Sequence, residues 1–151
     1  GSYIHGIFDG AGIAADPEGD HQPHTKRETF RQTLSDMLKV LYQQGVQPVL
    51  MSLPPIAPRR YLRFICRNGL DRNAILRWLG DEDMIYRHQE LYSDTVTELA
   101  YANNVPLIHV RQAFLADHHM NDLLSADGIH LTMDGYGKLF DTLADWVRAR
   151  L

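Results

Sequence analysis

The residues best suited to chemistry lie near the C-terminus, in segment 126–132. Asp127 precedes His130 by three positions, and Gly128 between them permits a tight turn that brings both side chains to one rim. A carboxylate at one ring nitrogen fixes the tautomer of an imidazole, so that the other nitrogen can take a proton from a hydroxyl. The alternative is a solvated turn in which Asp127 caps the backbone and His130 is incidental.

The elements that must position this turn alternate between helices and short apolar runs. Thr25 and Glu28 form a capping-box pattern that predicts a helix start, and Gly45 predicts its end. Between them, apolar residues recur at three- and four-residue steps and give one apolar face: Phe30, Leu34, Met37, Leu38 and Leu41. Segment 46–51 follows as a predicted strand, with Pro48 near its start.

The second half of the chain repeats this order. Residues 81–104 predict a helix that closes at Asn103-Asn104, and residues 106–110 predict the next strand. Thr132 is the expected N-cap of a last helix. We expect the apolar stripe of that helix to point inward: Tyr136, Leu139, Phe140, Leu143, Trp146 and Val147.

This alternation predicts an α/β domain over residues 1–151, with a parallel sheet and a ligand crevice at the carboxyl ends of the strands. Segment 3–8 is the candidate for a third strand, and segment 54–80 reads as an insertion over the sheet end. Because doubly wound domains usually have five or more strands, we expect the chain to begin inside its domain.

The order of these features resembles the SGNH (GDSL-type) esterases and acyl hydrolases. Asp127-x-x-His130, followed by Gly135-Tyr136 and a final helix, looks like the last conserved block of that family. Segments 46–58 and 105–115 look like its fourth and fifth strand regions, and segment 16–25 looks like the loop after its third strand. The resemblance covers residues 9–151. It implies a flavodoxin-like three-layer α/β sandwich, with His130 as general base, Asp127 as its orienting carboxylate, and no metal or organic cofactor.

The chain also departs from the family pattern. The family's Gly-Asp-Ser block, its oxyanion Gly and its Gly-x-Asn-Asp motif are absent. Segment 6–9 is the near match to the last motif, with Phe8 where the Asn would stand; in the alternative register, Phe8-Asp9 falls a few residues after a lost Asn motif. Phe cannot donate a hydrogen bond to an oxyanion. Ser52, at a predicted strand end, is the best-placed substitute nucleophile, and Ser2 is a weaker one. We expect the chain to be the C-terminal part of a hydrolase, with very low turnover of its own.

Composition removes several other classes of function. A net charge of -4 and a pI near 6.0 argue against a nucleic-acid partner, and no apolar stretch approaches the ~20 residues of a membrane span. The single cysteine, Cys66, excludes an intrachain disulfide and, without a signal peptide, favours a cytoplasmic setting.

Other polar clusters have ordinary explanations. His118, His119 and Asp122 offer a weaker metal-assisted alternative, and a surface loop is the expected reading of that segment. We expect His21 to be architectural, His109 to be a buried or edge residue, and the arginines of segment 59–63 to form a solvated rim. The function predicted is hydrolysis of a small carboxylic ester from a lipid, acyl or acetylated-sugar class. The alternative is a non-catalytic relative that binds a ligand or partner, with self-association through an exposed sheet edge.

Overall fold

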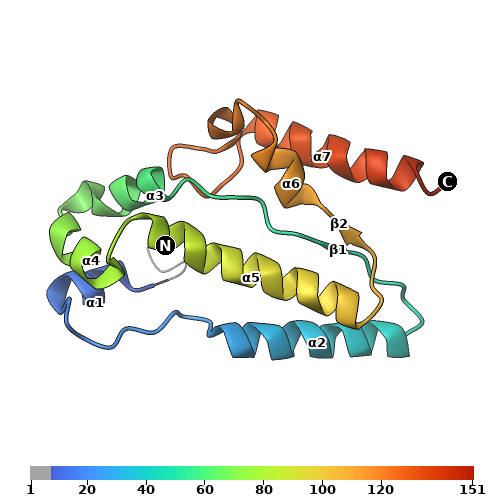
Figure 1. Cartoon of the computed structure of the whole chain (residues 1–151), viewed down its shortest axis with the longest axis horizontal. Coiled ribbons are helices and arrows are strands. Elements are labelled where there is room, and N and C mark those ends of the chain that lie inside the picture. The colour runs from blue at the N-terminus through green and yellow to red at the C-terminus, as the bar shows by residue number, and fades with distance from the viewer. Residues whose placement is uncertain (1–7) are drawn as a thin grey trace.

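The computed structural model describes residues 8–151 as an α/β arrangement around two short parallel strands (Figure 1). Strand β1 (Leu50–Met51) pairs with β2 (Leu107–Ile108), with Leu50 opposite Leu107. The helices are α1 (Gly10–Ala15), α2 (Arg27–Gln43), α3 (Pro58–Ile65), α4 (Arg72–Leu79), α5 (Asp83–Ala102), α6 (Val110–Leu115) and α7 (Met133–Arg148). Two 3-10 turns, η2 (Cys66–Asn68) and η3 (Met120–Leu123), follow α3 and α6.

The strands are shorter than the apolar runs that predicted them, because the helices use the ends of those runs. The Val46 amide donates to the Leu41 carbonyl and closes α2, and Pro48 has no amide to offer a ladder. His109 is already the N-cap of α6. The predicted strand at 3–8 lies outside the described residues, apart from Phe8.

The two predicted helix caps have different outcomes. Thr132 caps α7, since its hydroxyl accepts a hydrogen bond from the Gly135 amide at 3.1 Å, as predicted. The capping box at Thr25 is wrong. Lys26 is the N-cap of α2 and makes no side-chain capping bond, while the carbonyl of Thr25 accepts from the Tyr92 hydroxyl. The tie to α5 therefore fixes Thr25 outside the helix.

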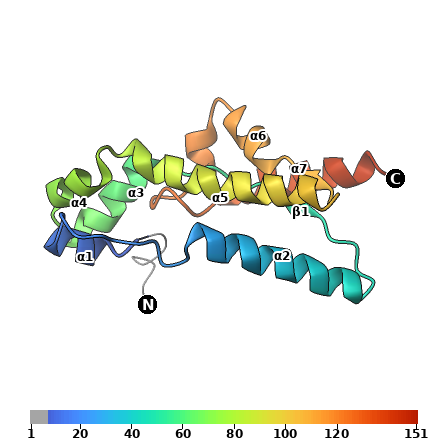
Figure 2. The same cartoon turned by 60° about the horizontal axis from the view of Figure 1, so that its bottom comes forward.

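Different helices cover the two faces of the sheet. Leu50 and Leu107 pack against Leu38 of α2 and Ala100 of α5, helices that run side by side in both views (Figures 1 and 2). Ile108 points the other way and packs against α6 and α7. A further core cluster joins α1, α3, α4 and the start of α5 at the far end of the molecule: Ile13, Ile56, Tyr61, Leu62, Ile65, Ile75 and Ile85. The predicted insertion at 54–80 thus supplies two helices of this core.

Helix α7 buries only half of the stripe predicted to face inward. Leu139, Leu143 and Trp146 pack against the β2 and α6 core. Tyr136, Phe140 and Val147 are 55%, 68% and 47% exposed, because β2 and α6 cover a narrower arc than the stripe spans. Within residues 8–151, no helix is both long and apolar enough to cross a membrane.

Candidate active site

The Asp127–His130 turn is closed by backbone bonds before its side chains interact. The Ser125 amide donates to the His130 carbonyl at 2.8 Å, and the Gly128 amide donates to the Ser125 carbonyl at 2.9 Å. Leu124 and Leu131 on either side form an antiparallel bridge. This narrow loop fixes the two side chains on the same rim, directly before α7.

The carboxylate of Asp127 is held by four donors. Its Oδ1 accepts from the Ser125 hydroxyl at 2.6 Å and from the amides of Ile129 and His130 at 3.0 Å each. Its Oδ2 lies 2.5 Å from His130 Nδ1. Burial alone would raise the pKa of Asp127, but these hydrogen bonds outweigh it and hold the pKa far below its ordinary value. Asp127 is therefore an anion across the physiological range.

An ionised Asp127 decides the proton arrangement on His130. Because a carboxylate only accepts, the Nδ1 of His130 must carry the hydrogen, which leaves Nε2 as the basic nitrogen of the neutral ring. The His130 side chain is 50% exposed, whereas that of Asp127 is 14% exposed. The turn thus presents a proton acceptor at the surface and keeps its counter-charge inside.

Contacts from α3 hold this turn in place. Gly128 has φ of +77°, and a Cβ there would lie 2.7 Å from the Ala57 carbonyl oxygen and 2.9 Å from the Tyr61 amide. The Ala57 amide donates to the Gly128 carbonyl at 2.8 Å. Only glycine fits, because the turn is left-handed and lies directly on the α3 backbone.

Arg60 holds the start of the turn in place, a role that the sequence analysis missed. Its Nη1 donates to the carbonyls of Asn121, Leu124 and Ser125, at 3.0, 2.7 and 3.0 Å. The prediction of a solvated rim is wrong for this arginine, which ties α3 to the start of the turn. These partners lie 61 to 65 residues away, so no local signal marks them.

The serines considered as nucleophiles have structural roles. Ser52 is 5% exposed, and its hydroxyl accepts from the Arg111 amide at 3.0 Å, so it is not available to a substrate. Ser93 is 2% exposed and accepts from the Leu53 amide. The hydroxyl of Ser125 is engaged by Asp127. Ser2 lies outside the described residues.

A buried arginine network also went unnoticed at the strand ends. Arg111 is 5% exposed and donates from Nη1 to the Leu53 carbonyl and the Gln89 side chain, while Glu90 pairs with its other terminal nitrogen. Its backbone amide reaches Ser52. The network fixes the exit of β1 against α5 and α6, and its residue types alone do not reveal it.

The other histidines divide between structural and surface roles. His21 Nε2 lies 2.6 Å from the Asp16 carbonyl oxygen and its ring meets Trp78 edge-on, which confirms an architectural role. His109 is exposed, not buried. His119 lies 3.8 Å from Asp122, with both side chains exposed. Across residues 8–151, no three His, Cys, Asp or Glu side chains form a metal-binding group, so the metal-assisted alternative has no ligand set there.

Comparison with known proteins gives a structural likeness. No protein-family model and no curated protein match the chain. The crystal structure of the lipase/acylhydrolase from Enterococcus faecalis matches with a TM-score of 0.57 and 21% sequence identity, over 94% of this chain and 59% of that one. The chain therefore spans about three fifths of the length of the hydrolase it resembles. At this identity the likeness shows the fold, which is SGNH hydrolase-like.

Proposed function

We propose that this protein contributes the general base and its orienting carboxylate to a serine ester hydrolase of the SGNH type. The observation that carries the proposal is the 2.5 Å contact between His130 Nδ1 and an Asp127 carboxylate that three other donors also hold. Such a pair is what acyl transfer by a hydroxyl nucleophile requires. The hydrolase-like fold supports the same reading.

In this mechanism His130 acts twice. Its Nε2 takes the proton of a serine hydroxyl as that oxygen attacks the ester carbonyl, and the imidazolium then gives the proton to the departing alkoxide. Water hydrolyses the acyl-enzyme with the same nitrogen as base. Asp127 stabilises the imidazolium in both steps and stays ionised throughout.

We further propose that the nucleophile and the oxyanion donors lie outside the described residues. Of the four serines within residues 8–151, those at positions 52, 93 and 125 have hydroxyls engaged in structural hydrogen bonds, and Ser35 lies within helix α2. Phe8, where the family carries an oxyanion Asn, instead packs its ring on Trp78 and His88. The three-layer sandwich belongs to this proposal too, with α2 and α5 on one face and α7 on the other.

A serine-directed fluorophosphonate probe tests where the nucleophile lies. After labelling and intact-mass analysis, peptide mapping is expected to show no stoichiometric adduct on residues 8–151. The buried Ser52, in particular, is expected to remain unlabelled. A clean single adduct on Ser52 would overturn the proposal.

Hydrolysis of p-nitrophenyl butyrate tests the role of His130. His130→Ala is expected to abolish the ester hydrolysis that the protein supports, whereas His118→Ala, in an exposed turn, leaves it unchanged. In addition, a low-field proton resonance from the Nδ1 hydrogen is expected by NMR and is lost in Asp127→Asn. Equal rates for His130→Ala and the unsubstituted protein would contradict the proposed role.

The uncovered side of β1 favours a second candidate, a binding role through self-association. Val49 and Met51 are 44% and 39% exposed on a segment without charged residues, and within residues 8–151 β1 pairs only with β2. An uncharged strand edge meets no like-charge repulsion from its own copy, so a second copy of this chain is the proposed partner. Tyr136 and Phe140 of α7 add exposed apolar surface.

Sedimentation velocity over a concentration series tests self-association. Val49→Lys is expected to return the protein to monomer, since a lysine blunts an edge. Val40→Lys, a matched change at an exposed valine of α2, is expected to leave association intact. A strictly monomeric profile at high concentration contradicts this candidate.

A further inference from the structure

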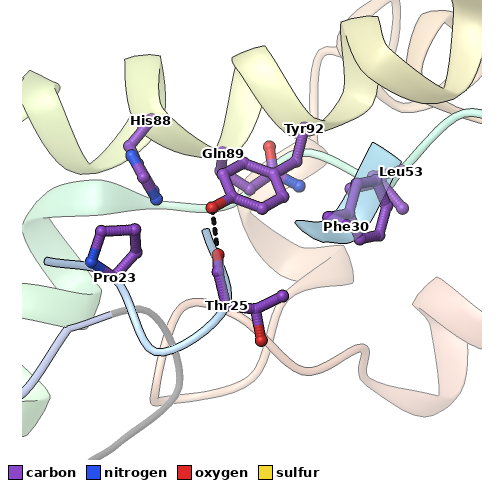
Figure 3. A pocket seen from close by; sticks show the side chains of 7 residues that line it. All are labelled: Pro23, Thr25, Phe30, Leu53, His88, Gln89 and Tyr92. Carbon is purple, nitrogen blue, oxygen red and sulfur yellow. Dashed lines mark hydrogen bonds between the residues drawn. The ribbon is translucent and has the colours of Figure 1, made fainter. Parts of the chain in front are cut away.

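An apolar cavity of about 260 Å³ lies beside α5, away from the residues of the Asp127–His130 turn (Figure 3). It is enclosed by the loop before α2, the start of α2, the exit of β1 and one face of α5. Its lining residues are Pro23, Thr25, Phe30, Leu53, His88, Gln89 and Tyr92. At ~30 Å³ for a water-sized group, it has room for roughly nine such groups.

Most polar side chains of the lining are already engaged. Gln89 donates from Nε2 to the Pro54 carbonyl at 2.9 Å and accepts from Arg111 through Oε1 at 2.8 Å. The Tyr92 hydroxyl donates to the Thr25 carbonyl, the dashed contact in Figure 3. These groups shape the cavity wall and have little capacity left for a ligand.

His88 differs from them. Its ring lies between Phe8 and Tyr92, with centroid separations of 4.6 and 5.0 Å, and its Nε2 is buried without a hydrogen-bond partner. Burial lowers the pKa of His88, so the ring is neutral at pH 7. A buried nitrogen without a partner costs about 1–3 kcal/mol, and native proteins rarely leave one unsatisfied. One polar ligand atom would satisfy it if the ring turned, since Nε2 is shielded from a water-sized group in this structure.

We infer that this cavity binds an uncharged aliphatic arm that carries one oxygen, with His88 Nε2 making the single polar contact. The neutral ring serves as acceptor for a hydroxyl or as donor to a carbonyl, according to its tautomer. A carboxylate is disfavoured at this contact, because no lysine or arginine lines the cavity to pair with its charge. The ligand class is therefore a short alcohol, or a hydroxylated or oxo-substituted alkyl chain.

The position of the cavity links this ligand to the catalytic turn. Leu53 lines the cavity, and four residues later the Ala57 amide binds the Gly128 carbonyl. Four residues span at most about 14 Å, so a short segment of chain joins the cavity wall to the anchor of the turn. We assign the bound arm to the ester substrate, a step that rests on the proposed function; the binding itself does not.

Direct binding to this chain tests the inference without turnover. In an NMR titration, 1-hexanol is expected to bind saturably and to shift the ring signals of His88 and Tyr92. Hexanoate, of the same length, is expected to bind at least about tenfold more weakly, because an unpaired charge cannot enter. Equal affinity for both, or no saturable binding of hexanol, overturns the inference.

Two variants separate the polar contact from the cavity itself. His88→Phe keeps an aromatic ring and removes the nitrogen, and is expected to weaken hexanol binding about tenfold. His118→Phe, at an exposed turn, is the matched control. Leu53→Phe narrows the cavity and is expected to reduce binding even if His88→Phe fails to fold. Unchanged affinity in a folded His88→Phe or in Leu53→Phe contradicts the inference.

The outcomes also distinguish the two proposals. Asp127→Asn is expected to retain hexanol binding, since the turn does not line the cavity. If hexanol binds while His130→Ala leaves hydrolysis unchanged, the proposed function fails and the cavity inference stands. If His130→Ala abolishes hydrolysis while hexanol does not bind, only the cavity inference fails.

Discussion

His130 and His88 occupy opposite surroundings within one molecule. His130 sits on a turn where backbone amides, a hydroxyl and a carboxylate satisfy one another within six residues. His88 lies between the ring of Phe8, from a distant part of the chain, and that of Tyr92, one turn along α5, and its Nε2 has no partner. The first environment supports a positive charge on an imidazole, and the second opposes one.

The difference shows how one side chain takes two roles. Beside a carboxylate, an imidazole is held in one tautomer and can serve as a base. In an apolar cavity the same ring stays neutral and serves as a hydrogen-bonding group. The role of a histidine is therefore decided by the groups around its ring, and the residue type alone does not reveal it.

The largest expected effect comes from removing the charge beside His130. Asp127→Asn keeps the shape of the turn but takes away the anion that fixes the tautomer, so hydrolysis by a protein that also carries the proposed nucleophile is expected to fall about 10⁴-fold. Steady-state kinetics on p-nitrophenyl butyrate measure the loss. A fall of less than tenfold would mean that His130 works without an orienting carboxylate.

A methyl group at position 128 is expected to displace the turn as a whole. Gly128→Ala places a Cβ 2.7 Å from the Ala57 carbonyl oxygen at a φ of +77°, which we expect to cost about 2–3 kcal/mol of unfolding free energy. Urea denaturation measures the change. Gly69→Ala, also at positive φ but with open space around its Cβ position, is the control and is expected to cost less. Equal losses of unfolding free energy in the two variants would show that the close contact with α3 does not cause the effect of Gly128→Ala.

Acid is expected to destabilise the folded protein through His88, because folding favours the neutral form of its ring. Since burial lowers the pKa of His88 in the folded protein, the unfolded chain binds the proton more readily, and stability decreases as pH falls below about 6.5. His88→Phe is expected to flatten this part of the stability curve. Tyr92 is the other titratable lining residue and does not titrate there.

Asp127 provides a second test of how stability depends on pH, over a lower range of pH. Its pKa is depressed on folding, so its stabilisation is complete above about pH 4 and is lost as pH falls further. Urea melts from pH 3 to pH 8 on the two single variants separate the contributions. A slope between about pH 5 and pH 6.5 that is unchanged in His88→Phe would show that the His88 ring is solvated.

The smallest effect is expected on the outer face of α7. Phe140 is 68% exposed, so Phe140→Ser is expected to change the unfolding free energy by less than about 0.5 kcal/mol. Leu143→Ala, on the packed face of the same helix, is expected to cost about 2–5 kcal/mol. Similar losses at both positions would show that another surface covers Phe140.

Sequence reasoning succeeded where the determining contacts are local. The Asp127–His130 spacing, the Thr132 cap and the close of α5 at Asn103 and Asn104, whose φ is +52°, all depend on residues within a few positions of one another. The three long helices α2, α5 and α7 begin and end within about two residues of their predicted bounds, whereas the short helices α1, α3 and α6 were not predicted.

It failed where a distant partner decides. Thr25 was expected to cap α2, but Tyr92 holds its carbonyl 67 residues away. The charge pattern around Arg60 gave no sign of the three carbonyls that it binds, and nothing near His88 signals a cavity. Half of the apolar stripe of α7 is exposed for a similar reason. Periodicity predicts which residues share one face of the helix, but not how much of that face the neighbouring elements cover.

The two prolines after β1 make the segment between the cavity and the anchor of the turn rigid. Pro54 and Pro55 lack amide hydrogens and have restricted φ angles, so the stretch from Leu53 to Ala57 neither extends the sheet nor folds into a helix. Changes that reshape the cavity at Leu53 therefore leave the anchoring of the turn at Ala57 undisturbed. Ligand preference and proton transfer can therefore change independently during evolution, because the rigid segment keeps a change at the cavity from reaching the turn.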